Sequence, residues 1–339
     1  MTTIHVALED GLLVVRGGNG HWEAEPRMEG MAPRCLAADP AHPERVWCGT
    51  VRAGAWRSHD AGASWRAAGE ALSALDLSAL AVGPNEEVVY AGTDPSAMWR
   101  SEDAGRRWEE LTAMSRLPSV PTWSFPPRPD TSHVRWITLD PAAPDRLYVC
   151  IEAGALVRSA DGGRTWTDRV PDGPWDTHTL AAHPEAPGRL YSAAGDGFGA
   201  PGHGYNESHD GGDTWERPDE GIERHYLYGL AVDPGDPDTL VVSAADSPLT
   251  AHDSRFADST VYRRRGRGPW QEVREGLPEP KGTVRALLAT NAEERGVFYA
   301  ASNRGVFRSA DGGASWEPLL APLPDRQRGR SPHAIAVTP

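Results

Sequence analysis

The sequence contains a single lysine, Lys281, only three cysteines and only five phenylalanines among its 339 residues. Nearly all positive charge is therefore arginine, and 34 Lys+Arg against 48 Asp+Glu leave a formal net charge of −14. Because non-specific binding to nucleic acid requires clustered cations, this acidity argues against a nucleic-acid partner. The chain also lacks a polybasic membrane patch and an apolar run of the roughly 18 residues that a membrane helix needs, so we expect no membrane partner.

The scarcity of cysteine also bears on the compartment. Cys35, Cys48 and Cys150 are odd in number and too few to form a disulfide framework in a chain of this length. The first residues, Met1 to His5, show neither a basic segment nor an apolar segment of a secretory signal. We therefore expect a cytoplasmic protein whose cysteines serve as small buried hydrophobic residues.

Tryptophan, by contrast, is abundant, and a repeat accounts for most of it. Five segments share the pattern Ser-x-Asp-x-Gly-x-x-Trp, and two weaker copies keep the glycine and the tryptophan. Seven of the 13 tryptophans thus occupy one repeated position: Trp22, Trp65, Trp108, Trp166, Trp215, Trp270 and Trp316. We expect each of these rings to pack as a large apolar plug between neighbouring sheets.

A second repeat consists of short apolar stretches that precede the first. They are marked by Leu36, Leu80, Ile137, Leu180, Leu230, Leu287 and Ile335, spaced 43 to 57 residues apart. This period fits a blade of four short strands and their turns. The stretches are rich in Val, Ile, Leu, Trp and Tyr and are bounded by Asp-Pro and Gly, while no segment sustains a helical period. The sequence therefore predicts an all-β, seven-bladed propeller with four-stranded blades and almost no helix.

The ring is expected to close through both ends of the chain. Residues 331–339 match only the first strand of a blade, and residues 1–30 match the other three. One shared blade would complete a single propeller domain over residues 1–339 and leave no exposed sheet edge.

On the Ser-x-Asp-x-Gly-x-x-Trp segments, the chain resembles the BNR or Asp-box repeat propellers. That group includes sialidases, xyloglucanase-like glycoside hydrolases, the sortilin propeller and photosystem II assembly factors. The resemblance spans essentially the whole chain and implies the propeller fold, but such repeats occur in enzymes and binding proteins alike. Seven blades in one domain are closer to the photosystem assembly factors, or to half of a xyloglucanase, than to the six-bladed sialidases.

The repeated aspartates are interpreted as turn residues. A carboxylate in a tight turn can accept hydrogen bonds from nearby backbone N–H groups, and the glycine supplies a positive φ. Catalytic acids or calcium ligands are the alternative, but one site does not need five copies around a ring: Asp60, Asp103, Asp161, Asp210 and Asp311. The basic run 263–267 stands where one blade lacks this motif, so we interpret it as a solvated turn.

Candidate functional residues gather on the opposite face, which we call the mouth. Two residues before the seven strand markers stand Arg34, Ser78, Arg135, His178, Tyr228, Arg285 and His333. Four residues before three of the markers stand His133, Asp176 and Tyr226, and Glu152 and Asp196 end two of the second strands. Alternation would aim the first-strand side chains into the central channel. The insertions 115–134 (with Trp123), 195–206 and 246–258 lie on the same face, mostly in blades three to five counted from Leu36.

Three kinds of chemistry are open to these residues. Glu152 and Asp196 could act as general acid and base in glycoside hydrolysis, with His178 as a third catalytic candidate. The set His133, His178, Glu152 and Asp196 could instead bind a divalent metal, although no local metal-binding motif is present. Arg34, Arg135 and Arg285 could clamp a carboxylate or phosphate. The remaining ligand-binding candidates are Tyr226, Tyr228, His333, Asp176 and Trp123.

Two functions follow from this pattern. The first is a hydrolase or lyase that acts on a small polar or anionic ligand, such as a sugar, at the mouth. The alternative is a non-catalytic scaffold that binds a peptide or protein partner, as the resemblance to assembly factors implies. A third interpretation assigns no function to the cluster, because the wet mouth of any propeller is lined by polar residues.

Overall fold

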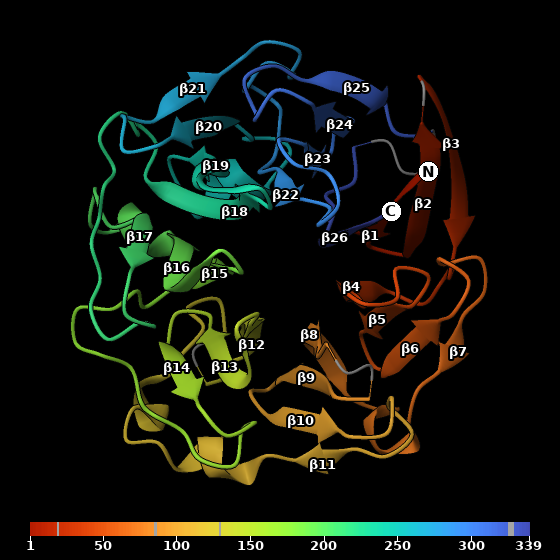
Figure 1. Cartoon of the computed structure of the whole chain (residues 1–339), viewed down its shortest axis with the longest axis vertical. Coiled ribbons are helices and arrows are strands. Elements are labelled where there is room, and N and C mark those ends of the chain that lie inside the picture. The colour runs from red at the N-terminus through yellow and green to blue at the C-terminus, as the bar shows by residue number, and fades with distance from the viewer. Residues whose placement is uncertain (19, 85–86, 129, 325–328) are drawn as a thin grey trace.

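The computed structural model of the chain describes residues 1–18, 20–84, 87–128, 130–324 and 329–339. Seven small antiparallel sheets form a ring, in which the two termini lie in the same sheet (Figure 1). The predicted all-β, seven-bladed propeller is therefore confirmed. Helix within the described residues is limited to short segments: η1 (Glu70–Leu72), η2 (Thr112–Arg116), η3 (Val120–Thr122), η4 (Gly195–Phe198) and α1 (Pro248–His252).

The blades are numbered from the first complete one. Blade one contains β4 (Pro33–Ala38), β5 (Val46–Thr50), β6 (Ala55–Ser58) and β7 (Arg66–Ala67), and blade two contains β8 (Asp76–Val82), β9 (Val89–Asp94), β10 (Met98–Ser101) and β11 (Glu109–Glu110). Blade three contains β12 (Val134–Asp140), β13 (Ala143–Ile151) and β14 (Ala155–Ser159), and blade four contains β15 (Thr177–His183), β16 (Ala186–Ala194) and β17 (Tyr205–Ser208). Blade five contains β18 (Tyr226–Asp233), β19 (Asp236–Ala245), β20 (Ser259–Arg265) and β21 (Gln271–Val273). Blade six contains β22 (Leu287–Ala289), β23 (Phe298–Ser302), β24 (Gly305–Ser309) and β25 (Glu317–Leu320).

Blade seven closes the ring in the predicted way. Its strand order is β26 (Ala334–Thr338), β1 (Thr2–Leu8), β2 (Gly11–Gly18) and β3 (His21–Arg27). The C-terminal strand pairs antiparallel with β1, from Thr3 opposite Thr338 to Ala7 opposite Ala334. Because the last strand is hydrogen-bonded to the first, both ends of the chain are held in one sheet.

Blades three and four depart from the regular four-stranded form. In the described residues, their outer strand is reduced to one isolated bridge, Arg158 with Thr167 in blade three and Glu207 with Glu216 in blade four. The shared positions of the repeat are kept in both blades, so the shortened outer strand does not disturb the ring.

The repeated Ser-x-Asp-x-Gly-x-x-Trp segments form one kind of turn, between the third and fourth strands. In blade one, Ser64 donates from its N–H to Asp60 Oδ1 (2.8 Å) and from its hydroxyl to Oδ2 (2.6 Å), while Ser58 Oγ accepts from the N–H of Gly62 (2.8 Å). These hydrogen bonds, chiefly those from Ser64, lower the pKa of Asp60 to about 2. Asp103, Asp161, Asp210 and Asp311 make the corresponding bonds. The carboxylates are thus occupied by their own turns, as the sequence predicted.

The tryptophan of each turn packs against the preceding blade. Trp108 of blade two donates its indole N–H to the carbonyl of Ala68 (3.1 Å) and meets Trp47 of blade one edge to face at 6.4 Å. The same ring fills the space beside Gly69, where a Cβ would lie 2.4 Å from it. The hydrophobic core is accordingly divided among the interfaces between blades, which is why the ring needs the tryptophan in every copy.

The interpretation of residues 263–267 as a solvated turn is wrong for the first three of them, which end β20, and above all for Arg264. Arg264 is only 4% exposed and forms an ion pair with the buried carboxylate of Glu207 in the neighbouring blade. Arg189 reaches the same carboxylate at 2.6 Å, and Tyr205 donates its hydroxyl to it at 2.9 Å. Two arginines and a phenol therefore satisfy one buried carboxylate, which makes this cluster a structural contact between blades four and five.

Candidate functional site

The candidate site lies at the mouth, where the inner strands begin and the second strands end. These ends are neighbours because the strands are antiparallel: the N–H of Glu152 donates to the carbonyl of His133 at 3.2 Å, and Asp76 pairs with Asp94. Side chains from blades three to six are in contact here, and we call them the mouth cluster: His133, Arg135, Glu152, Asp176, His178, Tyr226, Tyr228, His252 and Arg285.

A β-bulge aims several of these side chains. In each of the first five blades, the register of the inner strand shifts two residues before the strand marker, at Arg34, Ser78, Arg135, His178 and the Tyr228–Gly229 pair. Bulges turn a side chain away from regular alternation and are frequent beside active sites. Arg135, His178 and Tyr228 are therefore positioned by a repeated bulge and not by the simple alternation expected from the sequence.

One carboxylate oxygen of Glu152 is hydrogen-bonded to His133 and forms an ion pair with Arg135. His133 Nε2 lies 2.8 Å and Arg135 Nε lies 3.5 Å from Oε2. Burial by itself would raise the pKa of Glu152, but the hydrogen bond from His133 and the charges of His178 and Arg135 outweigh it, so the pKa lies well below its ordinary value. Glu152 is therefore ionised at neutral pH.

His178 is fully buried, and its orientation is set by the backbone. Its Nδ1 lies 2.7 Å from the carbonyl oxygen of Leu227, which can only accept, so Nδ1 carries the proton of this bond. In the neutral ring, Nε2 then bears the lone pair, and it lies 3.7 Å from Asp176 Oδ2 and 3.3 Å from the hydroxyl of Tyr226. The imidazole is thus fixed with a basic nitrogen toward a carboxylate.

Asp176 and Asp196 are joined by a hydrogen bond from the backbone of Asp176 to the side chain of Asp196. The N–H of Ala153 donates to Asp176 Oδ1 at 2.7 Å, and Asp196 Oδ2 accepts from the backbone N–H groups of Trp175 (3.0 Å) and Asp176 (3.1 Å). Burial raises the pKa of Asp196 above its ordinary value. Gly195 packs so closely that a Cβ would lie 2.2 Å from Asp176 Oδ2. Asp176, held by Ala153 and by Asp196, is the carboxylate that faces His178.

Tyr228 lies between two guanidinium groups. Arg135 donates to its hydroxyl at 2.6 Å, and the guanidinium carbons of Arg135 and Arg285 lie 4.8 and 4.6 Å from its ring centroid. Burial alone would raise the pKa of Tyr228, but the charges of Arg135 and Arg285 outweigh it and lower the pKa. Tyr226, two residues earlier on the same strand, has a pKa raised well above its ordinary value by burial and by Glu152.

A central cavity of about 60 Å³ adjoins the mouth cluster, and Arg34, Ser78, Arg135, Thr179 and His333 contribute its polar lining. Burial, and then the charges of Arg34, Arg285 and Arg135, lower the pKa of His333 to about 3, so this imidazole is neutral. No carboxylate in the described part of the chain pairs with Arg34 or Arg285. The cavity wall therefore carries positive charge that these residues leave uncompensated.

One predicted ligand-binding residue lies apart from the mouth cluster. Trp123 is buried among the apolar residues between blades two and three, and its indole N–H donates to Ser119 Oγ at 2.9 Å. Conversely, the sequence analysis did not select His252, whose Nε2 lies 3.1 Å from the Tyr226 hydroxyl. This histidine ends α1, and the capping pair Ser247 and Thr250 with Pro248 at the first turn was the available signal for that helix.

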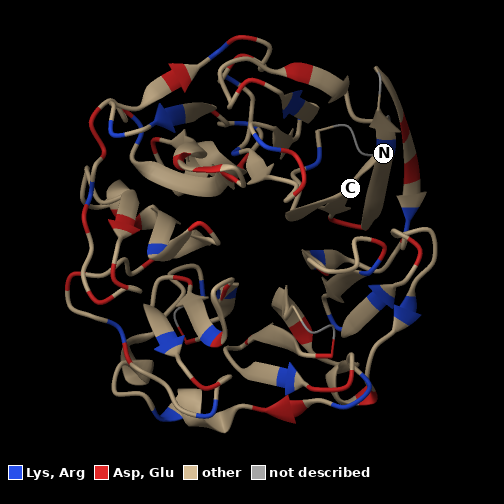
Figure 2. Ribbon diagram, in the orientation of Figure 1, with Lys and Arg blue, Asp and Glu red and all other residues tan. Residues whose placement is uncertain are grey.

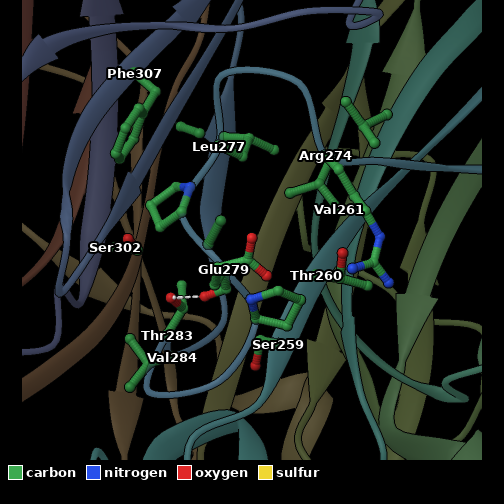
Figure 3. Close-up of a pocket in the computed structure, with 15 residues that line it drawn as sticks. Ser259, Thr260, Val261, Arg274, Leu277, Glu279, Thr283, Val284, Ser302 and Phe307 are labelled. Carbon is green, nitrogen blue, oxygen red and sulfur yellow. Dashed lines mark hydrogen bonds between the residues drawn. The ribbon is translucent and has the colours of Figure 1, made fainter.

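A second cavity, of about 30 Å³, lies between blades five and six (Figure 3). Aliphatic and proline side chains and Phe307 make up most of its wall, and the Thr283 hydroxyl donates to the carbonyl of Glu279 at 2.6 Å. The Thr283 hydroxyl is thus already satisfied by a local backbone carbonyl, and the described residues that line this cavity form no cluster of titratable groups. We therefore place the candidate site at the mouth.

Within the described residues, one group at the mouth has the donor atoms for a metal ion. One oxygen each of Glu152 and Asp176 and one ring nitrogen of His178 lie within 4.8 Å of one another. The set predicted from the sequence contained His133 and Asp196 in place of Asp176. In the structure, His133 is hydrogen-bonded to Glu152, and Asp196 is hydrogen-bonded to the backbone of Asp176.

No protein-family profile and no curated protein matches the chain. Solved structures do resemble it. The GH74 enzyme of Niastella koreensis superposes with a TM-score of 0.68 at 18% identity, over 94% of this chain and 52% of that one. The GH74 xyloglucanase of Xanthomonas campestris gives 0.68 at 17% identity over the same shares, and YCF48 bound to D1 peptide gives 0.58 at 17% identity over 91% and 92%. The chain thus spans about half the length of the GH74 structures, and at these identities the likeness establishes the fold alone.

Basic and acidic residues are intermixed around the ring (Figure 2). Among the described residues, none of the helices has the length and apolar composition needed to cross a membrane.

Proposed function

We propose that this protein is a hydrolase or lyase that acts on a small anionic ligand, such as an acidic sugar, at the mouth cluster. The observation that carries the proposal is the contact of carboxylates, imidazoles, phenols and guanidinium groups from four blades around His178 and Tyr228. A purely structural interface would pair its charges, as Glu207 and Arg264 do. At the mouth, Arg34 and Arg285 have no carboxylate partner among the described residues, which favours an anionic ligand.

The carboxyl groups support acid–base chemistry. Glu152 has a lowered pKa and Asp196 has a raised pKa. Environments that shift the pKa values of two carboxyl groups in opposite directions are typical of a base and an acid in one site. We assign Glu152 as the base and Asp196 as the acid. His178, with Nε2 directed into the site, is the third catalytic candidate, and Arg34 and Arg135 would bind the anionic group.

The test is turnover of a panel of chromogenic glycosides, uronides, and phosphate and sulfate esters. We expect turnover of an anionic member, and a loss of about a hundredfold or more in rate in Glu152→Gln and His178→Ala, because general acid–base groups contribute about 10²–10⁴. Asp161→Asn, which changes a turn on the opposite face, should keep the wild-type rate. Wild-type activity in both mouth variants would refute the assignment.

Binding of a peptide without catalysis is the second candidate. It is favoured by one observation, that the chain aligns with nearly the full length of the YCF48 structure bound to D1 peptide. Here the cationic wall of Arg34 and Arg135 would hold a peptide carboxylate. Peptides with free and amidated C-termini distinguish the two proposals: carboxylate-dependent binding together with no turnover of any panel member would favour the scaffold.

A further inference from the structure

We infer that Glu152, Asp176 and His178 form a binding site for one divalent transition-metal cation, of the Mn²⁺ or Zn²⁺ class. This inference names the cofactor class of the proposed site and rests on the proposal that the mouth cluster is functional. It is carried by the juxtaposition of three electron-pair donors from two neighbouring blades, with no bridging proton between them.

The donor atoms face one another without a hydrogen bond. His178 Nδ1 is committed to the carbonyl of Leu227, so in the neutral ring Nε2 presents its lone pair toward Asp176 Oδ2 at 3.7 Å. A shared proton would require a separation below about 3.2 Å. The Tyr226 hydroxyl lies between the two rings, 3.3 Å from His178 Nε2 and 3.1 Å from His252 Nε2. When the ring of His178 is neutral, a cation beside Nε2 and Asp176 Oδ2 would accept an electron pair from each of these two atoms.

The spacing suits coordination. Two ligand atoms each about 2.1 Å from one ion are about 3.4 Å apart in a tetrahedron and at most about 4.2 Å apart in any geometry. The 3.7 Å between His178 and Asp176 lies inside this range. A separation of 4.8 Å, the upper bound within the trio, requires a total movement of about 0.6 Å to reach the 4.2 Å limit and about 1.4 Å to reach the tetrahedral spacing.

Each ligand is held by a neighbour on its other atom, as metal ligands commonly are. The carbonyl of Leu227 holds His178, the N–H of Ala153 holds Asp176 Oδ1, and His133 holds Glu152 Oε2. Within the described part of the chain, Glu152 Oε1 and Asp176 Oδ2 receive no hydrogen bond. Each carboxylate of the trio thus keeps one oxygen available to an ion.

The close approach of Gly195 is a second, independent observation. A Cβ at this position would lie 2.2 Å from Asp176 Oδ2 and 2.9 Å from His178 Cε1. The glycine has an ordinary negative φ, so a turn does not require it. Its lack of a side chain leaves room beside the two donor atoms.

The donor types select the class of ion. Two carboxylates and one imidazole are a mixed O/N set, which suits Zn²⁺ and Mn²⁺, whereas Ca²⁺ and Mg²⁺ prefer sites made of oxygen alone. The two carboxylates also match the charge of a divalent ion when His178 is neutral. A bound ion would act as a Lewis acid and lower the pKa of a coordinated water.

The experiment is titration calorimetry of chelator-treated protein with MnCl₂ and with ZnCl₂. We expect one equivalent of at least one ion to bind to the wild type, and affinity to fall about 100-fold or more in His178→Ala and Asp176→Asn, since loss of even an outer partner costs about 10–100-fold. Glu152→Gln is the third variant, and thermal unfolding shows which variants are folded. Asp161→Asn is the matched acidic control and should bind like the wild type.

Absence of one-equivalent binding to the wild type by both ions overturns the inference. So does wild-type affinity in any two folded variants of the trio, because the ion would then lie elsewhere. If the wild type binds neither ion and its turnover survives chelation, the metal site is rejected and the proposed function still stands. If the wild type binds one equivalent of an ion but turns over no member of the substrate panel, the proposed function is rejected and the metal site still stands.

Discussion

Gly195→Ala is the most direct test of the geometry at the mouth, because it adds one methyl group beside the site and removes no ligand. The new Cβ would lie 2.2 Å from Asp176 Oδ2, 2.9 Å from His178 Cε1 and 3.0 Å from Tyr226 Cε2. An ordinary carbon–oxygen contact is about 3.4 Å or longer, so the carboxylate must retreat by about 1.2 Å. Metal–ligand distances tolerate about 0.2 Å.

The expected result is a tenfold to hundredfold loss of Mn²⁺ or Zn²⁺ affinity, comparable to the loss of an outer partner. The free energy of unfolding should fall by a similar amount, since tenfold to hundredfold in affinity is about 1.4–2.7 kcal/mol. Overpacking costs about 1–3 kcal/mol, and about 2.1 cal/mol/K per residue gives 339 residues an unfolding entropy of about 0.7 kcal/mol/K, so Tm should drop by about 1–4 °C. Calorimetric titration and thermal unfolding measure the two effects separately.

Gly199→Ala is the matched control. Gly199 ends the same short helix η4, but its added Cβ would have no neighbour closer than the carbonyl oxygen of Asp196 at 4.0 Å. This variant should bind the ion with wild-type affinity. Unchanged ion affinity in Gly195→Ala, or an equal loss in both variants, would refute the steric argument.

Three further predictions concern stability. Asp161→Ala removes the carboxylate that organises one turn and should lower the unfolding free energy by about 0.5–2 kcal/mol, or Tm by about 1–3 °C; an unchanged Tm would contradict the turn assignment. Because its turn lowers the pKa of Asp161 to about 2, this contribution is complete above about pH 4 and is lost as pH falls toward 2, so Asp161→Asn should lose less Tm than the wild type over that interval. Glu207→Gln leaves Arg264 without its buried carboxylate and should cost about 3–5 kcal/mol, whereas the exposed Glu216→Gln should leave Tm unchanged; equal melting of the two would show that the pair is not structural.

The fold was predictable because its determinants are local and repeated. Ser58, Asp60, Gly62 and Ser64 bond within one turn, so the eight residues of the motif carry the arrangement, and its recurrence reveals the blades. Arg264 shows the limit of this reasoning. Its partner Glu207 lies 57 residues away in another blade, and the chain between them offers no signal that the two will meet.

The site was predictable at the level of position and not of side-chain contact. Counting back from the strand markers located His178, Asp176 and Tyr228, because every blade places those offsets at the mouth. Two features decide whether Asp176 or Asp196 faces His178. They are the hydrogen bonds that Asp196 accepts from the backbone N–H groups of Trp175 and Asp176, and the β-bulge at His178. The periodicity of the sequence predicts neither feature. The sequence analysis paired Glu152 with Asp196 on spacing alone, and the structure places the Asp176 carboxylate beside His178.

The repeated bulge explains how a near-symmetric ring can carry a one-sided site. Blades one to five bend the inner strand at the same place, so each presents one side chain at the mouth, and identity alone distinguishes them: arginine in blade one, serine in blade two, arginine in blade three, histidine in blade four and tyrosine in blade five. The turns of five blades on the opposite face keep their serine, aspartate and glycine because each uses the same hydrogen bonds to join its third and fourth strands. The mouth has no such shared constraint. A scaffold of this kind separates the residues that maintain the ring from those free to differ, and here the differing residues of blades three to five are the ones that contact one another.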